Sequence, residues 1–274
     1  MARKGIDCSK WQGHIDWEKA KATGNVEFAI ARSGWGKESP TQVDNTFEQN
    51  YTECKTHDIP VGTYHYSYAD CISDAKLEAQ FCLKNIAGKQ LEYPVCFDIE
   101  DKEMLKLSTQ TRTDICKAFC DAIEAAGYYV VLYTNLDWYR NKLFGAELAK
   151  KYDIWLAQWY ASSPAVNCGI WQKSEVGKIN GISGNVDLNE AYKDYPAIMK
   201  SKGLNGFKSD NSSVPPPVTT PPPSDKTYTV LKDDNLWVIS KRLLGDGTKW
   251  RQIYDLNGLK SETIYPGQTL KIPN

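Results

Sequence analysis

The sequence predicts an α/β protein in which a large barrel precedes a small second domain. Short apolar strands alternate with helix-like stretches over roughly the first 200 residues, a proline-rich segment follows, and about 50 residues remain after it. Strands that alternate with helices form parallel sheets, and six or more strands in a domain of this size favour closure into a barrel.

Six segments are predicted to be strands because β-branched and aromatic residues are concentrated in them. They span 4–11, 27–35, 59–69, 93–101, 128–135 and 152–160. Helix-like runs lie between several of them, at 44–58, 73–88 and 108–127, and the last of these has Ser and Thr at its start and Gly127 at its end. After Gln158 we expect no further helix in this first part of the chain, and 169–189 predicts two short strands in a hairpin.

Two triple-proline runs, within SSVPPPVTTPPPSDK at 212–226, mark a domain boundary. Such a segment continues neither a helix nor a central strand, and it favours an extended spacer. We therefore divide the chain into a catalytic-type barrel at 1–208, a linker at 209–226 and a small module at 227–274.

Composition excludes several classes of function. The net charge of −1 argues against a nucleic-acid partner, and no stretch approaches the length of a membrane span. All eight cysteines lie in the first 168 residues without a CxxC pair, so we expect reduced core cysteines and no zinc site. The start, MARKGIDCSK, has no apolar h-region, so we expect no secretory signal peptide and synthesis in the cytoplasm.

Acids stand where predicted strands end. In YPVCFDIED, at 93–101, strand alternation turns Asp98 and Glu100 to the same face, with Cα atoms roughly 6.6 Å apart. Asp7 ends the apolar part of the first strand, and Asp187 ends the last one, GNVDLN. The carboxyl ends of parallel barrel strands meet at one face, so we expect these four carboxylates to converge in one cleft.

The residue types around these acids favour sugar chemistry over metal binding. A metal site would prefer His ligands or a denser oxygen cage, and only His65 lies near a strand end, on the face opposite to Tyr64 and Tyr66. Nine Trp and sixteen Tyr are suited to stacking against sugar rings. We assign Glu100 as the general acid, with its pKa raised by the neighbouring charges, and expect neither a metal nor a cofactor. No Ser-His-Asp pattern or glycine-rich phosphate loop is present.

Seven motifs together resemble glycoside hydrolase family 25, the muramidases of phage endolysins and bacterial autolysins. They are GIDCSKWQGHIDW, FAIARSGWG, DIPVGTYHYSYA, PVCFDIED, VLYTN, IWLAQW and GNVDLN, in that order over residues 4–195. The resemblance implies an irregular (β/α)5β3 TIM-like barrel that cleaves the β-1,4 bond between N-acetylmuramic acid and N-acetylglucosamine in peptidoglycan.

Carried over by position, the resemblance implies Glu100 as the acid and Asp7, Asp98 and Asp187 as the other active-site carboxylates. Two mechanisms stay open: Asp98 orients the N-acetyl group of the substrate as nucleophile, or Asp7 or Asp187 acts as base or nucleophile. The expected sugar contacts are Tyr64, Tyr66, Tyr133, Trp155, Gln158 and Trp159.

The tail resembles one LysM module, with an expected strand–helix–helix–strand (βααβ) layout. The resemblance implies that its two loops bind N-acetylglucosamine-containing glycans through Asp234, Asn235, Leu236, Ile264, Tyr265 and Pro266. Asp233 and Asn235 depart from the usual Gly-Asp-Thr-Leu. A spacer between this module and the barrel would hold the enzyme at an insoluble wall.

The main hypothesis is thus a monomeric peptidoglycan hydrolase, made in a host cytoplasm as a phage endolysin and released to the wall through a holin-made lesion. A bacterial autolysin exported by another route stays open. Two alternatives of function also remain: a chitin-type hydrolase of N-acetylglucosamine polymers, and a non-catalytic wall-binding protein that has kept the barrel as a scaffold.

Overall fold

The computed structural model describes residues 2–37, 39–208, 226–231, 234–244, 246–259 and 261–273. The chain divides into two compact units, residues 1–211 and 212–274. The linker expected at 209–226 lies outside the described residues except for its last position. No helix in the described ranges is long and apolar enough to cross a membrane.

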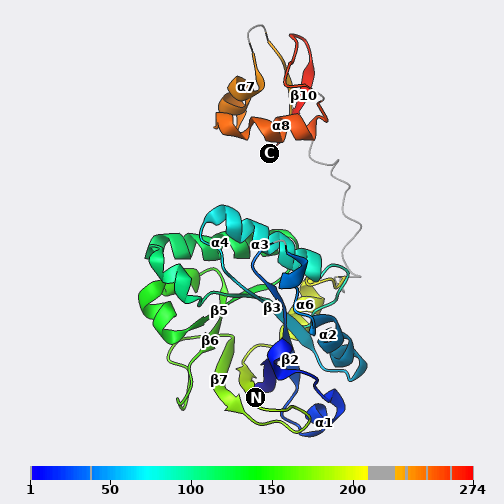
Figure 1. The fold of residues 1–274 in the computed structure, drawn as a ribbon, viewed down its shortest axis with the longest axis vertical. Helices are drawn as coiled ribbons and strands as arrows, with labels where there is room; N and C mark the ends of the chain where they lie inside the picture. The colour runs from blue at the N-terminus through cyan, green and yellow to red at the C-terminus, as the bar shows by residue number, and fades with distance from the viewer. Residues whose placement is uncertain are drawn as a thin grey trace. The chain divides into compact units, whose positions relative to one another are not determined.

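The first unit is a closed barrel of eight strands in sequence order (Figure 1). The strands are β1 (Arg3–Cys8), β2 (Phe28–Trp35), β3 (Val61–Tyr66), β4 (Val95–Asp98), β5 (Val130–Asn135), β6 (Asp153–Ala157), β7 (Ile170–Gly177) and β8 (Val186–Ala191). β1 to β7 run parallel to one another, whereas β8 runs antiparallel to both β7 and β1. This is the predicted α/β barrel, and its closing hairpin is β7–β8.

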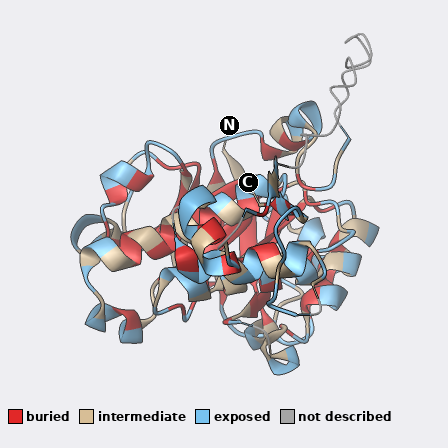
Figure 2. Ribbon diagram, turned by 90° about the horizontal axis from the view of Figure 1, so that it is seen from above, coloured by how far each residue is buried: buried red, intermediate tan, exposed pale blue. Residues whose placement is uncertain are grey.

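Helical segments follow each of the first five strands. They are η1 (Lys10–Gln12), α1 (Trp17–Ala22), η2 (Pro40–Gln42), α2 (Phe47–Thr56), α3 (Ile72–Asn85), η3 (Lys102–Lys106), α4 (Thr109–Ala125), η4 (Trp138–Lys142) and α5 (Gly145–Leu148). No helix separates β6, β7 and β8 in the described chain, which gives the irregular (β/α)5β3 order. Figure 2 shows the strands buried and the helices exposed mainly on their outer sides.

The prediction that no helix follows Gln158 is wrong. After β8 the chain forms α6 (Tyr195–Lys202). The Asp194 side chain accepts a hydrogen bond from the Ala197 N–H at the start of this helix, and Gly203 ends it with a left-handed φ of 62°. The helix has only eight residues and a weak helical pattern in its sequence, so it was not predicted. The Asp194 cap and Gly203 nevertheless define its two ends.

Alternation along each strand divides the core into two layers. Outward-facing residues such as Phe97 pack under the helices, where the Phe97 ring stacks on Phe119 of α4 with centroids 4.2 Å apart. Inward-facing residues such as Cys96 and Val131 fill the barrel. Asp98 has the same parity as Cys96 and therefore belongs to the interior face. All eight cysteines are free thiols.

The second unit has the predicted α+β layout. Its strands β9 (Lys226–Thr229) and β10 (Thr269–Ile272) pair antiparallel, and α7 (Leu236–Leu243), η5 (Gly247–Lys249) and α8 (Trp250–Leu256) lie between them in sequence. Its small core contains Val230, Leu236, Ile239, Ile253, Leu270 and Ile272.

Asn205 ties the segment after α6 to the starts of two barrel strands. It is fully buried with a φ of 55°. Its Nδ2 donates to the Tyr93 carbonyl at 2.9 Å, and its Oδ1 accepts from the Tyr129 N–H at 2.7 Å. Asparagine suits this position because it tolerates the left-handed conformation and supplies both a donor and an acceptor.

We expect Asn205→Ala to lower the free energy of unfolding by about 2–4 kcal/mol, because two buried backbone groups lose their partner and alanine is strained at positive φ. Asn205→Gly removes the same hydrogen bonds without the strain, so its loss should be smaller. Urea denaturation followed by tryptophan fluorescence measures both variants. An unchanged midpoint for Asn205→Ala would contradict this role.

Candidate active site

Four carboxylates gather at one mouth of the barrel. Asp7 lies near the end of β1, Asp98 is the last residue of β4, and Glu100 follows two residues later. Asp187 is the second residue of β8 rather than the end of a strand, which corrects the sequence expectation. Because β8 runs antiparallel to its neighbours, its beginning lies at the mouth where the parallel strands end.

Asp7 and Asp187 are direct neighbours across the β1–β8 pairing. Side chains in this position lie about 5 Å apart, and two carboxylates so close together, one buried and one half-buried, do not both stay charged. Burial, the charge of Asp7 and a hydrogen bond with Asp7 raise the pKa of Asp187 to about 9. At neutral pH Asp187 therefore keeps its proton and donates a hydrogen bond to Asp7.

Two buried amides orient Asp7. Nε2 of Gln172 on β7 and Nδ2 of Asn189 on β8 donate to the same Asp7 Oδ2, at 3.0 and 2.7 Å. These hydrogen bonds favour the charged form of Asp7, whereas burial, the largest influence, raises its pKa. The two amides thus fix the orientation of Asp7 and stabilise its charged form.

The same two amides fix three aromatic side chains. Oε1 of Gln172 accepts from the Tyr133 hydroxyl at 3.2 Å and from Nε1 of Trp159 at 3.1 Å. Oδ1 of Asn189 accepts from Nε1 of Trp155 at 2.8 Å. The nitrogen of each amide therefore donates to Asp7, and its oxygen accepts from these aromatic side chains, which we call the aromatic wall.

Asp98 and Glu100 form the second carboxyl pair. Asp98 is 5% exposed, and its Oδ1 has no hydrogen-bond partner among the described residues. Burial first, and then the charge of Glu100, raises the pKa of Asp98 well above its ordinary value. Glu100 is half-buried, and burial raises its pKa while a hydrogen bond from Asn135 Nδ2, at 3.4 Å from Oε2, opposes this rise.

This arrangement gives the carboxyl groups different chemical capacities. Glu100 combines a raised pKa with access to the mouth, which are the two properties that a proton donor needs near neutral pH. Asp98 is buried beside it and cannot exchange protons as freely. Asp7 is the carboxyl whose charged form the two buried amides stabilise. The site is therefore suited to general acid catalysis next to a stabilising negative charge.

Three of the six predicted sugar contacts offer surface in the cleft. Trp159 is 38% exposed. Tyr64 and Tyr66 are half-buried, and the Tyr66 hydroxyl donates to Oδ2 of Asp101 at 3.1 Å. Asp101 in turn caps η3, so the Tyr66 ring is anchored to a loop that begins directly after the acids.

The other three offer little surface or none. Tyr133 is 6% exposed and Trp155 is 1% exposed, and their rings pack edge to face inside the barrel with centroids 4.6 Å apart. The Gln158 side chain accepts a hydrogen bond from the Ala165 N–H at 2.8 Å, so its own loop holds it. Trp155 therefore supports the site instead of presenting a surface to a sugar, whereas Gln158 is half-buried and held by its own loop.

Sequence reasoning missed Gln172, Asn189 and Asn135. A signal existed for Asn189, because it lies two residues after Asp187 and strand alternation puts both on one face. Asn135 ends a predicted strand and could have been included on the same ground as Asp98. For Gln172 we find no such signal, since its importance depends on the barrel pairing β7 beside β8.

One group in the described residues brings three ligand atoms within 4.8 Å of one another: Asp70, Cys71 and Asp74. It lies between β3 and α3, and Asp74 already forms an ion pair with Lys37. The four acids at the barrel mouth do not form such a group. Their spacing therefore fits acid chemistry better than a metal cage.

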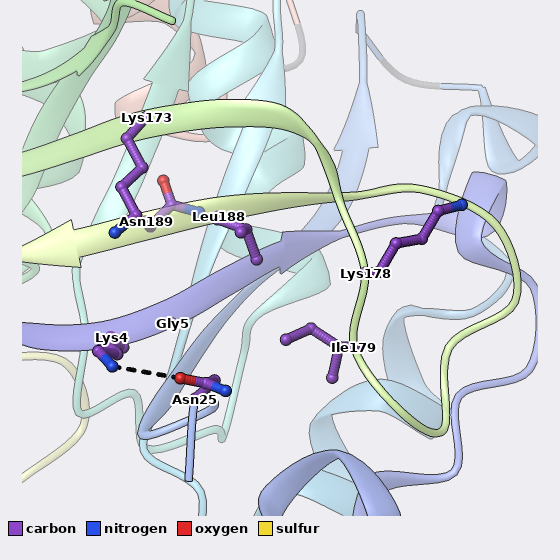
Figure 3. Close-up of a pocket in the computed structure, with 8 residues that line it drawn as sticks. All are labelled: Lys4, Gly5, Asn25, Lys173, Lys178, Ile179, Leu188 and Asn189. Atoms are coloured by element: carbon purple, nitrogen blue, oxygen red, sulfur yellow. Dashed lines mark hydrogen bonds between the residues drawn. The ribbon is translucent and has the colours of Figure 1, made fainter. Parts of the chain in front are cut away.

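A pocket on the outside of the barrel wall, beside the β7–β8 hairpin, carries no carboxylate (Figure 3). It is lined by Lys4, Gly5, Asn25, Lys173, Lys178, Ile179, Leu188 and Asn189. Lys4 Nζ donates to the Asn25 side chain at 3.3 Å, and Lys173 pairs with Glu190. Without an acid or an aromatic ring, this pocket cannot perform the chemistry available at the mouth.

In the second unit, the loops after β9 and before β10 lie side by side, with the Gly267 N–H donating to the Val230 carbonyl at 2.8 Å. Tyr265 is 67% exposed and Pro266 is exposed, whereas Ile264 packs partly into the core. Of the six predicted glycan contacts, Asn235, Tyr265 and Pro266 are exposed, and Tyr265 and Pro266 provide the aromatic and apolar surface.

Asp234, Asn235 and Leu236 have structural roles. Asp234 accepts a hydrogen bond from the Tyr228 hydroxyl at 2.6 Å, Asn235 caps α7 through its side chain, and Leu236 is a core residue. Asn and Thr are both good helix caps, so the departure at Asn235 preserves the local structure. Asp233, the other departure, lies outside the described residues.

Two family models match the chain. The model described as glycosyl hydrolases family 25 matches residues 6–182, and the LysM domain model matches 228–273. The chain belongs to glycosyl hydrolases family 25. It is therefore a glycoside hydrolase of the lysozyme family with a C-terminal LysM domain, as the sequence resemblance implied. Asp7, Asp98 and Glu100 lie within the matched segment, and Asp187 lies just beyond it.

Curated relatives include two bacterial lysozymes. Lysozyme M1 of Streptomyces globisporus is 31% identical over 202 residues, which cover 68% of this chain and 67% of that protein. The autolytic lysozyme of Clostridium acetobutylicum is 30% identical over 189 residues, and the chain spans only 55% of its length. The similarity thus covers the barrel, and the remainder of the clostridial protein has no counterpart in the alignment.

Solved structures give the same picture. The bacterial lysozyme from Streptomyces coelicolor has a TM-score of 0.62 at 28% identity, over 70% of this chain and 93% of that one. The CTP1L endolysin has a TM-score of 0.63 at 28% identity, over 73% and 70% of the two chains. The modular autolysin LytC from Streptococcus pneumoniae, solved with a synthetic peptidoglycan ligand, has a TM-score of 0.62 at 26% identity, over 70% and 47%.

Proposed function

We propose that this protein is an N-acetylmuramidase that cleaves the β-1,4 bond between N-acetylmuramic acid and N-acetylglucosamine in peptidoglycan. The observation that carries the proposal is the pair formed by Glu100, half-buried with a raised pKa, and the buried Asp98 next to it. Similarity to two lysozymes and to a structure solved with a peptidoglycan ligand supports the choice of substrate.

In this proposal Glu100 protonates the leaving glycosidic oxygen. Its half-buried carboxyl can reach a sugar lying across the mouth, and burial raises its pKa above the ordinary glutamate value, which favours the protonated form. Asp7, whose charged form is favoured by the hydrogen bonds from Gln172 and Asn189, stabilises the positive charge that develops on the sugar ring in the transition state.

Asp98 is proposed to orient the N-acetyl group of the substrate. Its Oδ1 is buried and finds no donor in the described protein, and a buried acceptor without a partner costs about 1–3 kcal/mol. The N–H of an acetamido group is a donor of the right kind. This supports the substrate-assisted mechanism, in which the acetamido oxygen attacks the anomeric carbon and configuration is retained.

The LysM domain is proposed to hold the barrel at the wall. Tyr265 and Pro266 offer an exposed aromatic and apolar surface on the paired loops, which suits the apolar face of a sugar. Attachment through one module raises the effective concentration of the other at an insoluble substrate.

Glu100→Gln should lower kcat on purified Gram-positive peptidoglycan by about 100-fold or more, because the amide cannot donate the catalytic proton. The assay is the release of reducing ends, followed by identification of the new terminal sugar. Wild-type enzyme should expose reducing N-acetylmuramic acid. Glu124→Gln, an exposed residue of α4, serves as the matched control.

Reducing N-acetylglucosamine as the new end would contradict the muramidase assignment. Equal rates on chitin oligomers would favour the chitin-type alternative. Wall binding without any release of reducing ends, in wild type and variant alike, would leave only a binding protein.

The pH profile should depend on Asn135. Activity needs protonated Glu100, so it falls as pH rises through the pKa of that group, which lies above the ordinary glutamate value. Asn135→Ala removes a hydrogen bond that favours the charged form, so the pKa of Glu100 rises and the alkaline limb of kcat/KM moves to higher pH. Asn141→Ala on the neighbouring η4 should leave the limb in place. A shift to lower pH would contradict the assignment of Glu100 as the acid.

The biological role proposed is that of an endolysin, made in a host cytoplasm and released to the wall through a holin-made lesion. Eight free cysteines, seven of them buried, are compatible with folding in a reducing compartment. Expression in a Gram-positive host should cause lysis only when a holin is produced with the enzyme. Lysis without a holin, together with enzyme in the medium before lysis, would favour an exported autolysin.

A further inference from the structure

A pocket of about 390 Å³ borders the acids over the carboxyl ends of β2 and β3. It is lined by Lys10, Trp11, Arg32, Trp35, Tyr66 and Tyr68, and we call it the Lys10 pocket. Strand register places Trp35 beside Tyr66 and Tyr66 beside Asp98. The pocket therefore shares the Tyr66 wall with the acid cluster and continues the same cleft.

One of its two cations is already paired. Nε of Arg32 donates to Oδ2 of Asp44 at 2.9 Å, and Nη2 lies 2.8 Å from the same oxygen. Both side chains are buried, and the guanidinium carbon lies 4.9 Å from the centroid of the Trp35 ring. The charge of Arg32 is thus largely balanced, and its main effect is to stiffen this wall.

Lys10 is different because no carboxylate pairs with it in the described chain. Its Nζ lies 4.5 Å from the Trp35 ring centroid and 5.2 Å from that of Trp11, which is 76% exposed. Aromatic faces attract an ammonium group without using its N–H donors. Two indoles therefore hold a positive charge at the pocket wall, and its hydrogen-bonding capacity stays available.

The lysines of the outer pocket in Figure 3 lack this arrangement. Lys4 and Lys173 are engaged by Asn25 and Glu190, and no aromatic ring lines that pocket. A solvated lysine by itself does not indicate a binding site. The combination of a ring-held cation, a defined hollow and a wall shared with the acids distinguishes the Lys10 pocket.

We propose that the Lys10 pocket binds a carboxylate carried by the glycan next to the sugar that enters the acid cluster. The inference rests on the proposed function and deepens it. In peptidoglycan, N-acetylmuramic acid bears a lactyl group whose carboxyl is either free or extended by a peptide that has carboxylates of its own. Chitin has neither. Lys10 thus becomes a specificity-determining residue that favours acid-bearing glycans over neutral polymers of N-acetylglucosamine.

The test compares three substrates: glycan strands with their peptides, strands freed of peptide with lactyl carboxylates exposed, and peptide-free strands whose carboxylates are coupled to methylamine. Lys10→Gln in the full chain should raise KM about three- to fivefold on a carboxylate-bearing strand, the size expected for a partly exposed ion pair, with kcat retained. The difference from wild type should vanish on the neutral strands. Lys10→Arg should restore the lower KM.

Lys150→Gln is the matched control. It removes the same charge from the α5–β6 loop, at the opposite end of the barrel, and should leave every KM as in wild type. High ionic strength should abolish the advantage of Lys10 because salt screens an exposed ion pair.

Each outcome has a defined meaning. A rise in KM on peptide-bearing strands alone assigns the pocket to the peptide, and a rise on peptide-free strands alone assigns it to the lactyl carboxylate. An equal rise on all three substrates, or none on any, overturns the proposal while the muramidase activity stands. Failure of the wild-type enzyme to cleave any of the three strands overturns the proposed function instead.

Discussion

The pairing of β8 with β1 is the interaction on which the site depends. It closes the barrel, and because it is antiparallel it brings the beginning of β8 to the mouth where the parallel strands end. Asp187 then lies directly opposite Asp7. A register slip of one residue would turn Asp187 to the other face and separate the pair. Closure of the fold and assembly of the acids are thus the same structural event.

Burying two carboxylates at this closure is unfavourable, and the barrel offsets the cost locally. Asp187 keeps its proton at neutral pH, and the amides of Gln172 and Asn189 donate hydrogen bonds to Asp7. The absence of helices between β6, β7 and β8 in the described chain places these two amides on adjacent strands, both facing inward. Because each amide also binds an indole, the position of the charge and the shape of the aromatic wall are mechanically linked.

Part of the acid cluster was predictable from the alternation of side chains along strands and from the position of the acids near strand ends. Alternation along YPVCFDIED predicted only that Asp98 and Glu100 share a face, because a strand has two faces. The structure shows which face is which: Phe97 packs under α4, and Asp98 belongs to the barrel interior. The predicted hairpin made β8 antiparallel to β7, as observed. The bounds of so short a strand were not predictable, however, and Asp187 was placed at its end although it is the second residue of β8. Gln172 was not predicted as a site residue, because its role depends on the pairing of β7 with β8. Trp155 was assigned to the sugar because composition cannot distinguish an aromatic residue on a cleft wall from one beneath it.

The mouth of the barrel is chemically asymmetric, and this asymmetry bears on which bond is cut. Peptidoglycan alternates a neutral sugar with one that carries an acidic substituent, so it contains two kinds of β-1,4 bond. An acid catalyst such as Glu100 does not distinguish them by itself, because both leaving oxygens are alike. A carboxylate held by Lys10 on one side of the acids would fix the register of the strand, and with it the bond that lies over Glu100. Specificity for the bond after N-acetylmuramic acid would then come from a charge outside the catalytic carboxyl cluster, held in place by Trp11 and Trp35.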